Sequence, residues 1–242
     1  MNLSSYFRTR MGVLAFGAAT LAPTPSHPVR VTASDVSASN EKIASAYASI
    51  ADMWTKNFQQ IGEQFDVPRI ARYRSTAMTP CGVIREDNAE YCENDNTIYY
   101  DDVFVAGISK IVADSLHTDG DMAGIGIIAH ETGHAVAMQL GHHSRNSYEN
   151  ESTADCLAGA FAKNADKQGE LEKGDIDEAF YGMSLGGDPE PEATGNVRYD
   201  HMIQARLARQ SHGTKDQRTQ NFRDGLNGGA GACLDEFKNL AS

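Results

Sequence analysis

The stretch GIIAHETGHAVAMQLG, residues 126–141, contains two histidines four positions apart, with a glutamate directly after the first. On a helix, His130 and His134 lie one turn apart on the same face, with Cβ atoms about 5–6 Å apart, so both imidazoles can reach one zinc ion. Glu131 lies about 100° farther round the helix. The spacing therefore predicts two zinc ligands and a base, Glu131, that takes a proton from zinc-bound water as it attacks a carbonyl.

The residues around this motif favour a helix. An apolar run precedes the first histidine, and Gly133 is the only helix breaker within the motif. We expect Asp119 or Asp121 to cap the helix and Gly141 to end it. A chance match on a buried helix is the alternative, and this ordered context favours a metal site.

A third zinc ligand is expected on the next helix, predicted for about residues 149–162, because a catalytic zinc takes three protein ligands and keeps one position open. Glu151 follows His134 by 17 residues (151 minus 134), which leaves room for a returning antiparallel helix. Asp155 lies one turn farther on and can accept the outer N–H of a ligating histidine. Glu149 remains a rival ligand, and the histidines at 142–143 are expected at the surface of a loop.

The composition indicates one sizeable globular domain. The chain has 242 residues, of which 40% are hydrophobic and 22% charged. Its formal net charge is -12 and its pI is near 5.0. Nucleic acids and anionic membrane surfaces would be repelled by this charge, so neither is an expected partner. We find no internal repeat, and we expect one domain over residues 41–242.

The first residues have the layout of a secretory signal. Arg8 and Arg10 precede a short apolar run at 11–22, which is too short for a stable membrane anchor. We expect an export segment at 1–33 and a linker at 34–40, and therefore a secreted protein or one of the periplasm or cell envelope. The cleavage point stays open, and a disordered tail or a short membrane tether is the alternative.

Four cysteines in an exported chain predict two disulfides. Three pairings are possible. Cys81 and Cys92 flank a polar segment that reads as a turn between two extended pieces, so this local pair is preferred, and Cys156 with Cys233 follows by elimination. No CxxC spacing occurs, which argues against a thiolate zinc knuckle or a thioredoxin-type site.

Apolar periodicity predicts the remaining elements. A stripe from Ile43 to Phe65 recurs at steps of three and four, which indicates one face of a long helix that ends near 66–67, before Pro68. Short β-prone runs predict strands at 81–84 and 97–100. A helix is predicted at 103–115.

The last third of the chain reads as helix, loop, helix. Asp175 is expected to open a helix with Glu178 three residues on, close to a capping-box pattern. Gly and Pro predict a loop at 186–196.

Four blocks together resemble the neutral zinc metallopeptidase family of bacteria: CGVIREDNAEYCENDNTIYYD, HETGH, ESTADCLAG and SHGTKDQRTQNFRDG, in that order. The resemblance runs from about residue 70 to the end of the chain. It implies an α+β, mainly helical zincin-like domain with a small sheet beside the active-site helix. It also implies zinc bound by His130, His134 and Glu151, with Glu131 as catalytic base and Asp155 as support. The short N-terminal apolar run departs from the membrane-anchored members.

His212 is a further catalytic candidate, as a donor to the negative charge that develops on the carbonyl oxygen. Its alternative is an exposed turn, since Thr214 and Gln217 form a capping-box pattern just after it. We expect an exported zinc peptidase acting on a peptide or protein, with a strand near 97–100 pairing with the substrate. The alternative is a non-enzymatic secreted module that binds zinc or peptides, and the oligomeric state is not readable.

Overall fold

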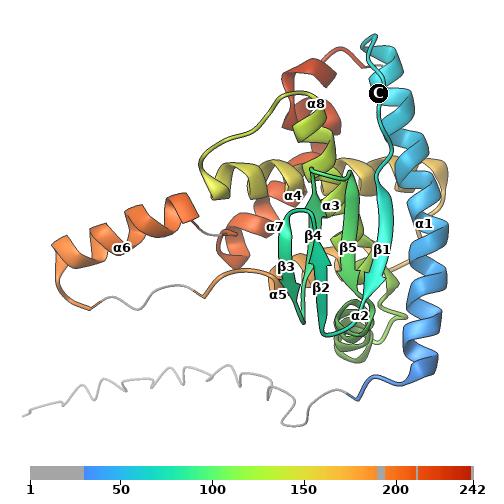
Figure 1. Ribbon diagram of the computed structural model, residues 1–242, viewed down its shortest axis with the longest axis horizontal. Coiled ribbons are helices and arrows are strands. Elements are labelled where there is room, and N and C mark those ends of the chain that lie inside the picture. The colour runs from blue at the N-terminus through green and yellow to red at the C-terminus, as the bar shows by residue number, and fades with distance from the viewer. Residues whose placement is uncertain (1–29, 190–193, 211, 241–242) are drawn as a thin grey trace, which may run out of the picture.

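The computed structural model describes residues 30–189, 194–210 and 212–240, so most of the expected export segment lies outside the described residues. The longer helices are α1 (Ala33–Gln60), α2 (Asp102–Leu116), α3 (Asp121–Gln139), α4 (Ser147–Gln168), α5 (Asp175–Leu185), α6 (Val197–Gln210) and α7 (Lys215–Gly228). The short ones are α8 (Ala230–Cys233) and the 3-10 turn η1 (Asp235–Phe237). The strands are β1 (Arg69–Tyr73), β2 (Thr76–Thr79), β3 (Gly82–Arg85), β4 (Ala89–Cys92) and β5 (Thr97–Asp101). This is the expected mainly helical α+β architecture, with a small sheet in front of α3 and α1 along one side (Figure 1).

Helix α1 shows the predicted stripe, but its limits differ from the prediction. Its first turns include residues 34–40, which were expected as a linker, because Thr32 and Asp35 form a capping box at its start. It ends at Gln60, earlier than expected, and Gly62 follows with a φ of +82°. Phe65 therefore lies beyond the helix, yet it packs on Phe58 with ring centroids 4.9 Å apart.

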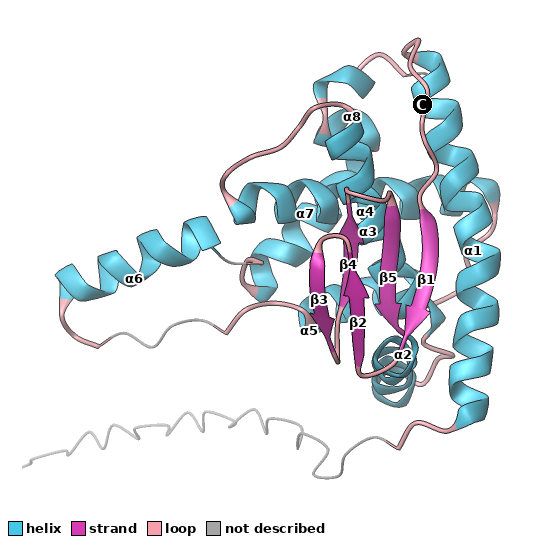
Figure 2. Ribbon diagram, in the orientation of Figure 1, coloured by secondary structure: helices cyan, strands magenta, loops and turns pink. Residues whose placement is uncertain are grey.

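The sheet places a different strand at its edge from the one expected. Strand β5 lies in the centre, parallel to β1 and antiparallel to β4, and β2 and β3 form a separate hairpin (Figure 2). The predicted strands at 97–100 and 81–84 correspond to β5 and β3. Because β5 is hydrogen-bonded on both sides, the expected pairing of substrate with 97–100 is wrong. The two edge strands of this sheet are β1 and β4, and β4 is the edge that packs against α3.

The start of α3 is capped from a distance. The N-cap is Gly120 and makes no side-chain cap, so the expected cap by Asp119 or Asp121 is wrong. Both aspartates bind Lys42 instead. The carboxylate of Glu178, on α5, accepts the N–H groups of Gly120 at 3.1 Å and of Met122 at 3.0 Å.

The capping box expected at the start of α5 is also absent. Its N-cap is Gly174, with no side-chain hydrogen bond. Asp175 accepts the Glu172 N–H instead, at 2.7 Å. Glu178 is unavailable to its own helix because it caps α3.

Close helix contacts bring the histidine helix and the glutamate helix together. A Cβ added at Gly133 of α3 would lie 2.9 Å from the carbonyl oxygen of Ala154 on α4. A Cβ at Gly225 of α7 would lie 1.8 Å from the Cys156 carbonyl oxygen. Gly133 lets α3 and α4, the helices that carry the zinc-ligand candidates, approach closely, and Gly225 does the same for α4 and α7.

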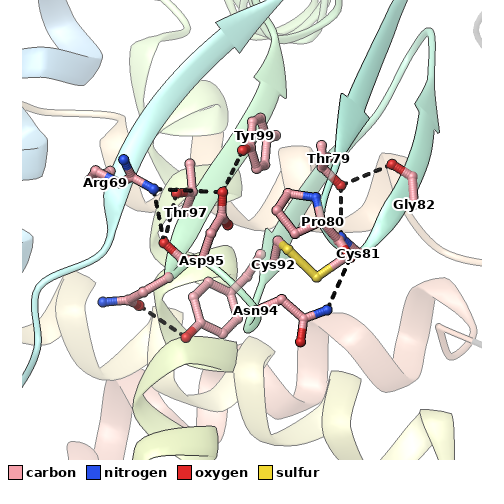
Figure 3. Close-up of a disulfide and its surroundings, with 12 residues drawn as sticks. Arg69, Thr79, Pro80, Cys81, Gly82, Cys92, Asn94, Asp95, Thr97 and Tyr99 are labelled. Atoms are coloured by element: carbon pink, nitrogen blue, oxygen red, sulfur yellow. Dashed lines mark hydrogen bonds and ion pairs between the residues drawn. A yellow bond between two sulfur atoms is a disulfide. The ribbon is translucent and has the colours of Figure 1, made fainter.

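Two disulfides link separate parts of the fold, in the pairing expected. Cys81 at the tip of the β2–β3 hairpin is bonded to Cys92 at the end of β4 (Figure 3). Cys156 of α4 is bonded to Cys233 of α8, across 77 positions of sequence. No helix among the described residues is long and apolar enough to cross a bilayer.

Candidate metal centre

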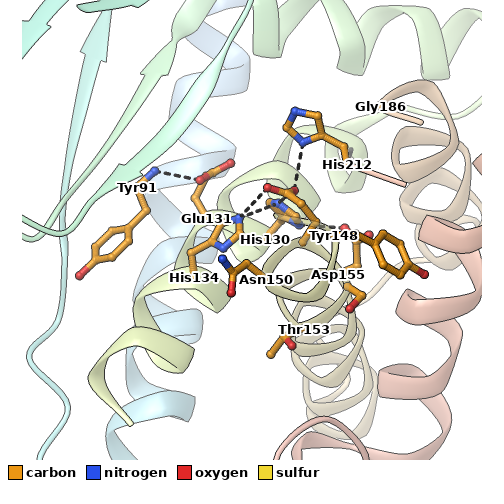
Figure 4. Close-up of polar contacts among 12 residues, drawn as sticks. Tyr91, His130, Glu131, His134, Tyr148, Asn150, Thr153, Asp155, Gly186 and His212 are labelled. Atoms are coloured by element: carbon orange, nitrogen blue, oxygen red, sulfur yellow. Dashed lines mark hydrogen bonds and ion pairs between the residues drawn. The ribbon is translucent and has the colours of Figure 1, made fainter. Parts of the chain in front are cut away.

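Three side chains from two helices converge on one point. His130 and His134 of α3 point to the same side of their helix (Figure 4). Together with Glu151 of α4 they offer ligand atoms that all lie within 4.8 Å of one another. The two Nε2 atoms are 3.1 Å apart, and His130 Nε2 is 3.2 Å from Glu151 Oε2. His134 Nε2 is 3.7 Å from Glu151 Oε1. Tetrahedral zinc with bonds near 2.0–2.1 Å sets its ligand atoms about 3.3 Å apart. These donors therefore fit zinc.

The outer nitrogen of His130 is held by a buried carboxylate. His130 Nδ1 lies 2.8 Å from Asp155 Oδ1, and Asp155 is 0% exposed. Donation of the Nδ1 proton to Asp155 leaves Nε2 facing the ligand cluster. Burial opposes charge on His130, but the hydrogen bond and charge of Asp155 prevail and raise its pKa to about 10, so zinc binding at Nε2 would release a proton from this ring.

Arg218 supports Asp155 and was missed by the sequence analysis. Its Nε donates to Asp155 Oδ2 at 3.1 Å and its Nη2 to Oδ1 at 2.7 Å, and Nη1 reaches the Gly186 carbonyl at 2.9 Å. Burial would raise the pKa of Asp155, but its contact with His130 and the charge of Arg218 lower it. The only sequence signal for Arg218 was its place in the block that begins SHGTKDQR.

Glu131 lies beside the ligand cluster and is held by the edge strand. Its Oε2 accepts the backbone N–H of Tyr91 at 2.9 Å, a contact that the side-chain pattern could not reveal. Burial raises the pKa of Glu131 to about 7, although the charge of His130 opposes the shift. A carboxylate with this pKa suits proton transfer near neutral pH.

His134 is the second candidate ligand. Burial and the neighbouring charge of His130 lower the pKa of His134 to about 4. Its imidazole is therefore neutral at neutral pH, and neutral imidazole is the form that binds metals.

His212 has features of both expectations for its segment, a donor at the site and a residue of an exposed turn. Its Nδ1 lies 3.1 Å from Glu151 Oε2, so the fold does bring it to the site. Its side chain is nevertheless 62% exposed, and Thr214 and Gln217 form the capping box of α7 just after it. The backbone N–H of His212 donates to Asp188 at 2.8 Å.

The rival candidates lie outside the cluster. Glu149 bonds to Ser144 and Asn146, at the start of α4. His142 is exposed and pairs with Glu236 at 2.8 Å, and His143 is exposed. Both histidines are therefore surface residues, as expected.

The model of a family described as "Putative neutral zinc metallopeptidase" matches residues 10–237. The chain belongs to this family. Two relatives are each named "Uncharacterized protein YpfJ", from Escherichia coli strain K12 and from Escherichia coli O6:H1 strain CFT073. Each is 31% identical over 221 residues, covering 82% of this chain and 73% of the relative. No solved structure matches the chain.

Membership in the neutral zinc metallopeptidase family agrees with the geometry. The family description implies zinc, and the His130, His134 and Glu151 group can hold a metal ion. The match spans the sheet, the histidine helix and the helices that carry Glu151 and Arg218. At this coarse level the chain is a zinc peptidase.

Proposed function

We propose that the protein is an exported zinc-dependent peptidase that hydrolyses peptide bonds, with His130, His134 and Glu151 as zinc ligands. The observation that carries the proposal is the convergence of these three donors within 4.8 Å, next to Glu131. Three protein ligands leave one tetrahedral position for water, which is the composition of catalytic sites, whereas structural zinc sites take four. This favours an enzyme over a non-catalytic zinc-binding or peptide-binding module.

Each residue of the site has its own role in the proposed hydrolysis. Zinc, when bound, acidifies water and polarises the substrate carbonyl. Glu131 accepts the proton from the attacking water and later passes it to the leaving amine. The Tyr91 N–H occupies Glu131 Oε2, which leaves Oε1 as the atom that exchanges the proton. Asp155 and Arg218 keep His130 oriented.

His212 lies next to Glu151, the proposed third zinc ligand. Its Nδ1 bond to Glu151 holds that carboxylate, and its exposed ring can turn Nε2 towards the substrate. A hydrogen-bond donor at this position would stabilise the negative charge that develops on the carbonyl oxygen of the substrate.

Substrate backbone has an edge strand to pair with. Strand β4 borders the same cleft as His130 and Glu131, and an extended peptide can add to such an edge. Export agrees with the two disulfides, which persist in oxidising compartments.

Glu131→Gln tests the proposal, because the amide cannot accept a proton while the ligand set is intact. Zinc content should remain at the wild-type level, and hydrolysis of a peptide library should fall about 10²–10⁴-fold. The matched control is Glu63→Gln, an exposed position outside the cleft, which should retain full activity. Peptide binding without hydrolysis by the zinc-loaded wild type would favour the non-enzymatic module.

A further inference from the structure

A second hollow adjoins the cleft of the metal centre, at the Cys92 end of β4. The cleft has a volume of about 1160 Å³, and the second hollow has a volume of about 500 Å³. Tyr91, Glu93 and Met138 line both of them, so a ligand can extend from one into the other. We call the second hollow the side pocket.

The amide side chains of the side pocket bind the protein itself. Asn96 donates to the Asp66 carbonyl at 3.0 Å and accepts the Tyr91 hydroxyl, also at 3.0 Å. Gln139 accepts the Asp66 N–H at 2.9 Å and donates to the Asp66 carbonyl at 2.8 Å. These bonds join the end of α3 to the loop before β1. They fix the wall of the side pocket around the Asp66 backbone and leave the Asp66 carboxylate free.

Two carboxylates in the side pocket have no partner. Asp66 and Glu93 are exposed, and neither side chain forms a hydrogen bond or an ion pair within the part of the chain that the structure describes. The nearby Asp95 differs, because Arg69 Nη2 lies 3.6 Å from its carboxylate (Figure 3). Among the described residues that line the side pocket there is no lysine, arginine or histidine. The side pocket therefore carries uncompensated negative charge.

The pKa of Tyr91 reflects this negative charge. Burial raises the pKa of Tyr91, and its hydrogen bond with Gln139 opposes the shift. The charges of Glu93, Asp66 and Asp95 raise it further. These carboxylates therefore oppose a second negative charge beside the Tyr91 hydroxyl and favour a positive one.

The composition of the side pocket suits a long organic cation better than a metal ion. Among the described residues, neither Asp66 nor Glu93 belongs to a group whose ligand atoms converge closely enough to hold a metal. Tyr91 and Met138 supply an aromatic ring and a thioether chain. The methylene stem of a lysine or arginine can pack against these two side chains while its charged head reaches the carboxylates.

The edge strand decides where on a substrate this cation lies. Tyr91 donates its N–H to Glu131 and not to β5, so the free edge of β4 faces the reacting groups. A peptide that adds antiparallel to β4, the more stable pairing, places its residues before the scissile bond towards Glu93. Glu93 follows Tyr91 by two positions, and a strand advances about 3.3 Å for each residue. The matching substrate residue is therefore the second or third before the scissile bond.

We propose that the side pocket binds the lysine or arginine side chain of a substrate residue two or three positions before the scissile bond. The proposal rests on the peptidase function proposed above, and it names the class of peptide that the site prefers. Asp66 and Glu93 would repel a carboxylate at that position, so acidic peptides are disfavoured there.

Cleavage of a peptide library by the zinc-loaded wild type, read by mass spectrometry, is the first test. Peptides with lysine at the second or third position before the cleaved bond should be cut at least about fivefold faster than the same peptides with acetyl-lysine, which keeps the stem and lacks the charge. No cleavage of any peptide would contradict the proposed function itself. Cleavage without preference for the charge, or with the preference after the cleaved bond, would overturn the side pocket alone.

Charge-changing variants test the side pocket directly. The double variant Asp66→Asn with Glu93→Gln should lower the ratio of rates for the lysine and acetyl-lysine peptides to about one, and Glu93→Lys should favour glutamate there instead. Both positions are exposed, and Asp66 bonds to Gln139 through its backbone alone, so these variants should fold and keep wild-type zinc content. Glu63→Gln removes an exposed carboxylate outside the side pocket and is the matched control, which should show the wild-type ratio. An unchanged ratio in the double variant would overturn the proposal.

A binding measurement separates recognition from turnover. Zinc-loaded Glu131→Gln should bind the lysine peptide at least about fivefold more tightly than the acetyl-lysine peptide, by calorimetry. The difference should shrink in high salt, because exposed ion pairs are screened. Adding the substitutions at Asp66 and Glu93 to this background should remove the difference. Equal affinities for the two peptides in Glu131→Gln would overturn the side pocket, even where the wild type hydrolyses peptides.

Discussion

Glu149 and Glu151 stand two positions apart on α4, and the helix turns about 100° for each residue. Their side chains therefore leave the helix about 200° apart, and only Glu151 faces the histidines. Glu151 lies 3.2 Å from His130 Nε2, whereas Glu149 bonds to Ser144 and Asn146. The helix phase alone separates a ligand candidate from a residue that orders its own helix start.

The two glutamates therefore make a matched pair of variants. Glu151→Ala should weaken zinc binding more than about hundredfold, because a direct ligand should cost more than a supporting residue. Glu149→Ala should keep wild-type zinc affinity and lose only some stability at the start of α4. Titration with zinc against a chelating dye measures both constants. Equal affinities in the two variants would exclude Glu151 as the third ligand.

The sequence alone predicted those site residues whose relative positions follow from helical spacing. His134 lies one helical turn after His130, and Asp155 lies one turn after Glu151. Helical spacing therefore predicts that each pair shares one face of its helix. Arg218 reaches Asp155 from 63 positions away, and only the packing of α7 on α4 brings them together.

At the scale of elements, the periodic patterns predicted the helices but not their starts. Asp121 and Asp175 satisfied the local rule for caps, and both became the first residue of a helix capped by glycine. The partner that caps α3 is Glu178, 56 positions from Met122. A cap supplied by another helix leaves no local signal.

Glu178 therefore stabilises the histidine helix from its buried place on α5. Glu178→Gln removes the negative charge at the positive end of α3 and turns an amide group towards backbone donors. We expect the free energy of unfolding to fall by about 1–3 kcal/mol. Urea denaturation measures the change, and Asp177→Asn, at the exposed neighbouring position, should stay within about 0.5 kcal/mol of wild type. An unchanged Glu178→Gln would show that the two hydrogen bonds contribute no net stability.

At the scale of the whole molecule, one apolar core joins α1, the sheet and the helices of the site. Trp54 and Phe58 of α1 pack on Phe237 near the C-terminal end, with ring centroids 5.7 and 5.9 Å away. The sequence predicted the α1 stripe as core, but no pattern could pair it with Phe237, because that contact depends on how the chain returns. The Cys156–Cys233 bond fastens this returning segment to α4.

The two disulfides should differ in their contribution to stability, because they close loops of different length. The Cys81–Cys92 bond spans 11 positions and the Cys156–Cys233 bond spans 77. Chain entropy in the unfolded state assigns about 3 kcal/mol to the shorter loop and about 4.5 kcal/mol to the longer one. Paired Cys→Ser variants, unfolded in urea without reductant, should reproduce this order.

The shorter bond should matter more for catalysis, since it ends β4 next to the Tyr91 N–H that holds Glu131. Removing the Cys81–Cys92 bond should therefore slow peptide hydrolysis at unchanged zinc content. If its removal lowered the free energy of unfolding more than removal of the Cys156–Cys233 bond does, the entropic account would be contradicted.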